Sequence, residues 1–108
     1  MLFLFLICHD DAFAAPDSMG PDTAAWADAL ERRDARRAGG RVQRPAEATV
    51  VQVRRGERIA RPGPRTSEPE YVAGFDVLEL ATVEEAIEAA ATHPMAPLGT
   101  IEIRRILP

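Results

Sequence analysis

An α+β architecture in one domain, residues 1–108, is predicted by the length of the chain and by the pattern of its apolar segments. A chain of 108 residues is long enough for one compact domain and too short for two. Apolar, strand-length segments recur from the start of the chain to its end, and two helix-like segments separate them. This alternation is typical of a sandwich of one antiparallel sheet and one layer of helices.

The first third of the chain supplies one strand and one helix. Residues 2–8, LFLFLIC, are continuously apolar, as expected of a central strand that is covered on both faces. Asp22 is a suitable N-cap for a helix over 23–38, which is rich in alanine and arginine. Trp26 is expected to anchor this helix in the core, and Gly39-Gly40 is expected to end it.

An arginine-rich hairpin is predicted next. Residues 49–54 and 58–61 have the length and composition of two strands. Gly56 can adopt the positive φ of a tight turn, so the turn is either Arg55-Gly56 or Gly56-Glu57. Residues 62–70 contain three prolines and are expected to form a rigid, irregular loop.

A strand–helix–strand unit completes the chain. Residues 71–80 and 100–107 are the two strand segments. Between them, Thr82 and Glu85 have the spacing of a capping box, which begins a helix that continues to about Thr92. The expected inner face of this helix consists of Val83, Ala86, Ile87, Ala90 and Ala91.

The resulting element order is β-α-β-β-β-α-β. An antiparallel sheet with both helices on one face is a ferredoxin-like arrangement. The other face of such a sheet is uncovered in a single copy. We therefore expect a homodimer in which a second copy covers that face.

The charge distribution argues against general nucleic-acid binding and marks one unusual segment. The formal net charge is −4, and all 13 cationic side chains are arginine. Residues 32–65 hold 11 arginines against three acidic residues, whereas the rest of the chain holds two arginines and 14 acidic residues. This asymmetry indicates an anion site or a partner surface, or else the solvated faces of a helix and a hairpin.

The single cysteine and the amino-terminal segment bear on the compartment. Cys8 has no second cysteine to pair with, so we expect a reducing compartment and a cytoplasmic protein. Its apolar neighbours favour a buried thiol over a nucleophile. Residues 2–8 are preceded by no basic residue and are too short to span a bilayer, so we expect neither a signal peptide nor a membrane partner.

His9, Asp10 and Asp11 form the strongest candidate cluster, at the end of the first strand. A histidine beside a carboxylate can be held in one tautomer and act as a general base near neutral pH. Because alternate residues of a strand face the same side, His9 and Asp11 are predicted to pair, with Asp10 facing away. The alternative is an acidic strand exit with a solvated histidine.

Substrate-binding candidates are spread over several segments. Arginine binds carboxylates through paired hydrogen bonds, and charged residues of a rigid loop can line a pocket mouth. A histidine at a helix C-terminus either caps the helix or faces the pocket. On these grounds the candidates are Asp10, Arg44, Arg65, Glu68, Glu70 (with Tyr71 beside it) and His93, with a solvated or structural role as the alternative for each.

No metal site and no cofactor are expected. The two histidines lie far apart and lack tight ligand spacing. The chain also has no glycine-rich phosphate loop and no serine-centred elbow, so nucleotide binding and triad hydrolysis have no support.

Three stretches together resemble the YCII-related family, in particular its DGPF-motif branch, over nearly the whole chain. They are LFLFLICHDDAF, RPAEATVVQVRRGERI and AGFDVLELATVEEAIEAAATHPMAPLGTIEIRRI. The resemblance implies a dimeric α/β-barrel built on a ferredoxin-like unit. A few members of the family act on small aromatic or polar metabolites, so the resemblance implies a ligand of that class. In shorter relatives, a His–Asp pair has been proposed as catalytic.

Two departures from this family pattern bear on function. The stretch that matches the name motif is Pro62-Gly63-Pro64-Arg65, which keeps the Gly-Pro turn but lacks the acidic and aromatic ends. Shorter relatives place a histidine in the first helix, whereas this chain has none between His9 and His93. That dyad is therefore not carried over.

These observations favour a small dimeric protein that binds a polar or aromatic metabolite. We expect cofactor-free elimination, hydration or isomerisation, with His9 as the base and Asp11 as its orienting partner. A non-catalytic ligand-binding or accessory module is the alternative, since a lost motif can mean lost chemistry. A third hypothesis is an interaction protein that uses residues 32–65 against an acidic partner. Whether the protein is an enzyme stays open at this point.

Overall fold

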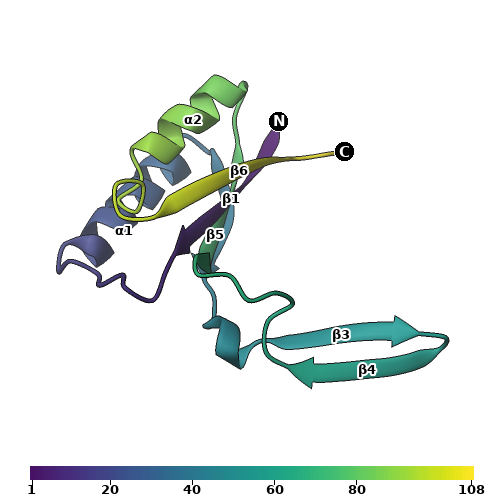
Figure 1. The fold of residues 1–108 in the computed structure, drawn as a ribbon. Helices are drawn as coiled ribbons and strands as arrows, with labels where there is room; N and C mark the ends of the chain where they lie inside the picture. Colours follow the sequence, from purple (N-terminus) through teal and green to yellow (C-terminus); the bar gives the residue numbers. More distant parts are fainter.

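A computed structural model describes residues 1–108 and contains a four-stranded antiparallel sheet with two helices on one face (Figure 1). The strand order is β2-β5-β1-β6. Alternate residues of the central strand β1 are buried, because Phe3, Phe5 and Ile7 all face the helices. The bounds of the four strands are β1 Leu2–His9, β2 Arg36–Arg41, β5 Tyr71–Glu79 and β6 Thr100–Ile106.

The helices α1 (Met19–Arg32) and α2 (Val83–Ala91) share one core with the sheet. Trp26 joins the two helices: its ring is buried, and its indole N–H donates a hydrogen bond of 2.9 Å to the carbonyl of Ala89. Neither helix is long and apolar enough to cross a membrane. The buried core consists of Phe3, Phe5, Ile7, Trp26, Leu30, Ala35, Leu78, Leu80, Ala86, Ala90 and Met95.

This arrangement confirms the predicted ferredoxin-like α+β fold. Of the two central strands, β1 is marked in the sequence by continuous apolar character, whereas β5 is a mainly apolar segment that contains Gly74 and Asp76. The predicted strand over residues 2–8 is one residue shorter than the observed β1. The last strand pairs with β1 over its whole length, which closes one side of the sheet.

The end of α1 and the strand β2 correct the predicted first helix. The helix begins at Met19, so Asp22 lies in its first turn and Ser18 occupies the N-cap. It ends at Arg32, after which Asp34 adopts a positive φ of 58° and turns the chain. Gly39-Gly40 lies within β2 and does not end the helix, because residues 36–41 form backbone hydrogen bonds with β5 instead of continuing the helix.

The hairpin of β3 (Thr49–Arg54) and β4 (Glu57–Pro62) forms a separate two-stranded sheet, which corrects its predicted place in the main sheet. Its turn is Arg55-Gly56, with φ values of 54° and 76°, as a type I′ turn requires. A short 3₁₀ helix, Pro45–Glu47, precedes it. The hairpin projects away from the body (Figure 1). The radius of gyration is consequently 15.8 Å, against about 13 Å for a compact chain of this length.

The amino-terminal end of α2 is the predicted one. The Thr82 hydroxyl accepts a 3.1 Å hydrogen bond from the Glu85 N–H, and the Glu85 carboxylate accepts one from the Ala81 N–H. The predicted inner face is only partly right. Ala86 and Ala90 are buried, whereas Val83, Ile87 and Ala91 are exposed. The bond between Trp26 and the Ala89 carbonyl turns the alanine side of α2 toward α1, which leaves the larger side chains outside.

Candidate functional site

Several titratable side chains lie together at the carboxyl end of β1. β1 ends at His9, which pairs across the sheet with Tyr71 at the start of β5. The chain then turns, because the Asp10 carboxylate accepts a 3.0 Å hydrogen bond from the Ala12 N–H. The loop that follows returns Phe13 to the histidine ring. Strand pairing and this short turn therefore place His9 between two aromatic side chains.

The imidazole of His9 is fixed on three sides. It stacks on Phe13, with ring centroids 4.4 Å apart, and meets the edge of Tyr71 at 5.3 Å. Its Nδ1 lies 2.8 Å from the backbone carbonyl oxygen of Asp10. A carbonyl oxygen only accepts hydrogen bonds, so Nδ1 must be the donor. In the neutral ring, Nε2 then carries the free lone pair.

Asp11 is the second polar centre of this end. One of its carboxylate oxygens accepts a 2.8 Å hydrogen bond from the Tyr71 hydroxyl and one of 3.1 Å from the Arg44 guanidinium. The hydrogen bond to Asp11 is the main cause that raises the pKa of the Tyr71 phenol, so Tyr71 stays a donor at neutral pH. Asp11 and Arg44 are largely exposed and accessible from solvent.

The structure shows no hydrogen bond between His9 and Asp11, the pair that the alternation of a strand predicts. The strand ends at His9, so the condition for that alternation is not met at Asp11. Asp11 binds Tyr71 and Arg44 instead, and the backbone of Asp10 takes the place of an orienting carboxylate for His9.

The remaining loop candidates are only partly gathered at this end. The Glu70 carboxylate accepts a 3.0 Å hydrogen bond from the Thr100 hydroxyl on β6. Burial is the main cause that raises the pKa of the neighbouring Cys8 thiol, and the charge of Glu70 adds to it, so Cys8 is a neutral thiol. Arg65 and Glu68 are exposed and form no ion pair within the chain.

Sequence reasoning missed two residues of this site, Phe13 and Thr100. The only local signal for Phe13 is an aromatic residue four positions after His9, which does not reveal the turn that brings the rings together. Thr100 meets Glu70 only through the sheet, where the two residues are 30 positions apart.

His93 lies in the core. It is 4 % exposed, its Nδ1 accepts a 2.9 Å hydrogen bond from the Met95 N–H, and its ring meets the edge of Trp26 at 4.5 Å. Burial lowers the pKa of its imidazole. These contacts belong to the packing of the chain after α2, and none of them is with His9.

The stability of the protein is expected to fall as the pH drops below 6.5, the ordinary pKa of histidine. The lowered pKa of His93 means that the unfolded chain binds the proton more readily than the folded one, so folding loses free energy as the pH falls. Urea unfolding at about pH 7.5 and about pH 5.5 measures the effect. His93→Gln retains an acceptor and does not titrate, so its pH dependence in this interval should be flatter. Equal slopes for both proteins would contradict the assignment.

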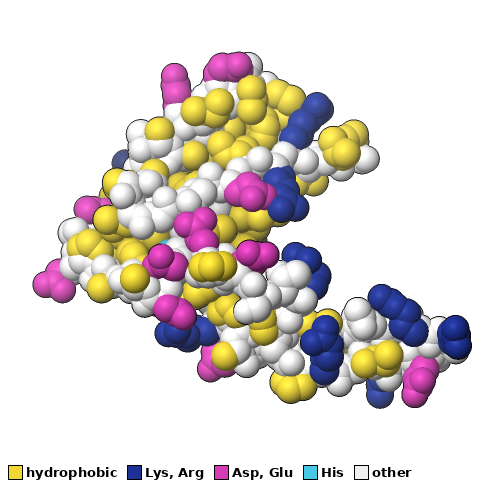
Figure 2. Space-filling view, in the orientation of Figure 1, with side chains coloured by type: hydrophobic (Ala, Val, Ile, Leu, Met, Phe, Trp, Pro, Cys, Tyr) yellow, Lys and Arg dark blue, Asp and Glu magenta, His cyan; other side chains and the backbone are white.

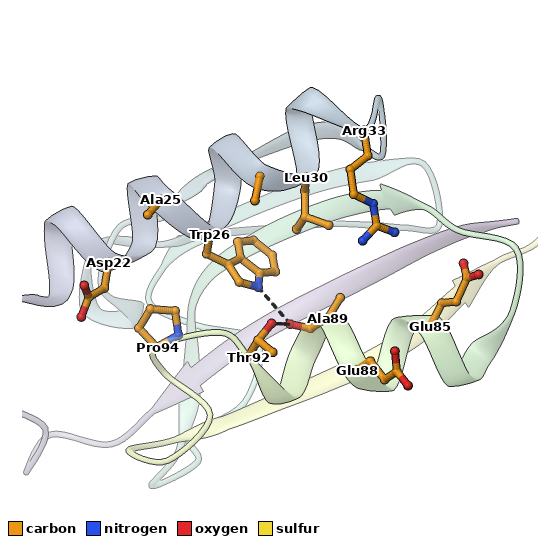
Figure 3. A pocket seen from close by; sticks show the side chains of 11 residues that line it. Asp22, Ala25, Trp26, Leu30, Arg33, Glu85, Glu88, Ala89, Thr92 and Pro94 are labelled. Atoms are coloured by element: carbon orange, nitrogen blue, oxygen red, sulfur yellow. Dashed lines mark hydrogen bonds between the residues drawn. The ribbon is translucent and has the colours of Figure 1, made fainter.

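A separate groove of about 800 Å³ lies between α1 and α2 (Figure 3). Trp26 lies in its floor, with the indole N–H already bonded to Ala89. Three carboxylates and one guanidinium line it, and they belong to Asp22, Glu85, Glu88 and Arg33. The groove contains no histidine or cysteine and does not include the residues around His9. The His9 end therefore holds an imidazole fixed by a hydrogen bond, whereas the groove holds carboxylates and one guanidinium but no imidazole or thiol.

The structure holds no group of three or more histidine, cysteine or acidic side chains in a position to bind a metal ion. Comparison with known proteins adds one positive finding. A family model, described as the YCII-related domain, matches residues 1–108. No curated protein matches the chain.

Proposed function

Because the chain belongs to the YCII-related family, we propose that it binds a small polar or aromatic metabolite at the His9 end of the sheet and transforms it by cofactor-free acid–base chemistry. The observation that carries this proposal is the tautomer of His9. Its Nδ1 donates to the Asp10 carbonyl at 2.8 Å, which leaves Nε2 as a base of defined position.

In the proposed reaction, Nε2 of His9 takes a proton from a carbon atom of the substrate. The Asp10 carbonyl then stabilises the positive imidazolium through the Nδ1–H bond. The electron pair left on the substrate either expels a leaving group, which is an elimination, or takes the proton back at a neighbouring atom, which is an isomerisation. Addition of water is the reverse of the elimination.

Asp11, Arg44 and Tyr71 would position the substrate. Arg44 uses one nitrogen for Asp11, so its other N–H groups are available for a substrate carboxylate. The aromatic rings of Phe13 and Tyr71 next to His9 suit a flat or aromatic substrate. The side chains of Asp10, Arg65, Glu68 and Glu70 form no hydrogen bond with His9, Asp11, Arg44 or Tyr71, and they would meet only larger substrates.

A homodimer is part of the proposal. On the sheet face opposite the helices, Leu4, Leu6, Phe75 and Val77 come from the two central strands and are only half-buried. Water-facing apolar side chains in the centre of a sheet favour a covering surface. A second copy, packed through the same face by a two-fold axis, would supply it.

Replacement of His9 by glutamine is expected to lower turnover at least about a hundredfold, because it removes the general base. A panel of small carboxylate-bearing aromatic and polar metabolites is first screened for binding by NMR, and bound compounds are then tested for conversion. Glu84→Gln, on the exposed first turn of α2, is the matched control and should retain full turnover. Undiminished conversion by the His9→Gln protein would remove His9 from the mechanism.

A non-catalytic ligand-binding module is the second candidate, and the groove between α1 and α2 favours it. A ligand of metabolite size fits about 800 Å³, and no histidine is there to act on it. The same NMR screen separates the two functions because Trp26 is the only tryptophan. A ligand in the groove shifts the Trp26 indole signal, whereas a ligand at the proposed site shifts the His9 ring signals.

A further inference from the structure

The hairpin of residues 49–62, here called the arm, has no partner within its own chain. It forms a two-stranded sheet of its own and projects from the body (Figure 1). A lone two-stranded hairpin is at best marginally stable in water. Contact with a surface outside the chain would therefore stabilise the arm.

One face of the arm exposes apolar side chains, with Arg58 opposite Val53 beside them. Val51 and Val53 lie two residues apart on β3 and so share a face, with 61 % and 60 % of their surface exposed. Ala60 lies opposite Val51 on the same face. Two exposed valines in a strand with nothing above them are the pattern of a contact surface.

The arm also differs in charge from the rest of the chain. Residues 49–62 hold four arginines and one glutamate, a net charge of +3, whereas the remaining nine arginines and sixteen acidic residues give −7. The arm arginines are Arg54, Arg55, Arg58 and Arg61, and none of them forms an ion pair within the chain. A positive arm and a negative body of the same protein are complementary between two copies.

The exposed surface of one copy is large enough for such a contact. The accessible surface is 7552 Å², whereas a compact monomer of this mass has about 5,900 Å². The excess is about twice the roughly 800 Å² that each partner loses in a standard interface. Figure 2 shows the source of the excess, a wide hollow between the body and the projecting arm.

We propose that the arm of each copy lies along the body of a second copy, so that two copies hold each other by reciprocal arms. The proposal rests on the homodimer of the preceding subsection. The second copy sits in the hollow, covers the apolar sheet face, and meets Val51 and Val53 of the first copy's arm. A nucleic acid is a less suitable partner for the arm arginines, because the acidic body next to them would repel its phosphates.

Sedimentation velocity over a dilution series tests the arm. We expect the unaltered protein to be dimeric and the Val51→Ser/Val53→Ser variant to have a dimer Kd at least tenfold higher. Val83→Ser/Ile87→Ser is the matched control, because these exposed apolar residues lie on the outer side of α2. It should leave the Kd unchanged. Raising the salt concentration should weaken the unaltered dimer more than the Arg54→Gln/Arg58→Gln variant.

A photocrosslinker at position 53 gives a second readout that does not depend on stability. With p-benzoylphenylalanine in place of Val53, irradiation should yield covalent dimers, whereas the same group at position 87 should yield none. If the serine variant dimerises with an unchanged Kd and position 53 gives no crosslink, the arm does not contact the second copy. That result would overturn the arm contact and leave the homodimer unaffected. A monomeric unaltered protein would overturn both. Binding of duplex DNA through the arm arginines, with the dimer unaffected, would assign the arm to a nucleic acid instead.

Discussion

Replacing Phe5 with alanine is expected to lower the free energy of unfolding by about 3–5 kcal/mol. Phe5 is 0 % exposed, lies at the middle of the central strand, and packs against Trp26 with ring centroids 6.5 Å apart. Only 14 of the 108 residues are buried, so the core is small and each large side chain carries a large share of it. Domains of this size have a total stability of about 5–15 kcal/mol, so the variant is expected to be close to unfolding at physiological temperature.

Urea unfolding at one fixed protein concentration measures this loss, because association would make the midpoint depend on concentration. Ile87→Ala is the matched control: its side chain is 54 % exposed on α2, so removing it opens no cavity. The control is expected within about 0.5 kcal/mol of the unaltered protein. A loss of less than about 1 kcal/mol for Phe5→Ala would contradict the placement of β1 at the centre of the core.

The parts of the fold that the sequence predicts well are those with local signals. A continuous apolar run predicts β1, and the spacing of Thr82 and Glu85 predicts the start of α2. The strand β2 has no such signal. Its sequence, RRAGGR, combines helix-favouring arginine and alanine with two glycines, and only backbone pairing with β5, some 40 residues later, makes it a strand.

The candidate site likewise has features that local sequence predicts and features that it does not. His9 lies near acidic residues because Asp10 and Asp11 follow it in the chain. The partners of Asp11 do not follow from the sequence, because Arg44 and Tyr71 are 33 and 60 positions away. The hydrogen bond that fixes the His9 tautomer depends on the orientation of the ring against the Asp10 carbonyl, which a sequence pattern does not contain.

Asp76 is a buried charge that sequence reasoning missed, and removal of its partner is expected to have the second large effect on stability. Its carboxylate lies on the helix side of β5, where Arg36 donates a 2.8 Å hydrogen bond from Nε. Gly39 leaves room for this pair, since a Cβ there would overlap with the Asp76 carboxylate and the Arg36 guanidinium. Arg36→Ala leaves the carboxylate without its cation and should lower the free energy of unfolding by about 3 kcal/mol.

Two comparisons test this ion pair. Arg37→Ala removes an exposed pair with Glu79 and should have a far smaller effect. The double variant Arg36→Met/Asp76→Leu replaces both charges by apolar groups and should recover most of the loss, because no unpaired charge remains. Failure of the double variant to recover would indicate that the strand β2 needs the guanidinium itself, for instance through its second bond to Glu31.

The pH dependence of stability in the Arg36→Ala variant tests whether the loss comes from the ionised Asp76 carboxylate. Burial already raises the pKa of Asp76, against the opposing effect of Arg36, so loss of Arg36 raises it further. A carboxyl group with a raised pKa in the folded state binds its proton more readily there than in the unfolded chain, and its penalty grows as the pH rises. The deficit of Arg36→Ala relative to the unaltered protein should therefore be largest at neutral pH and should shrink as the pH falls toward 3.8, the ordinary value for aspartate. A deficit independent of pH would mean that the variant loses packing by the arginine stem and not a partner for a buried charge.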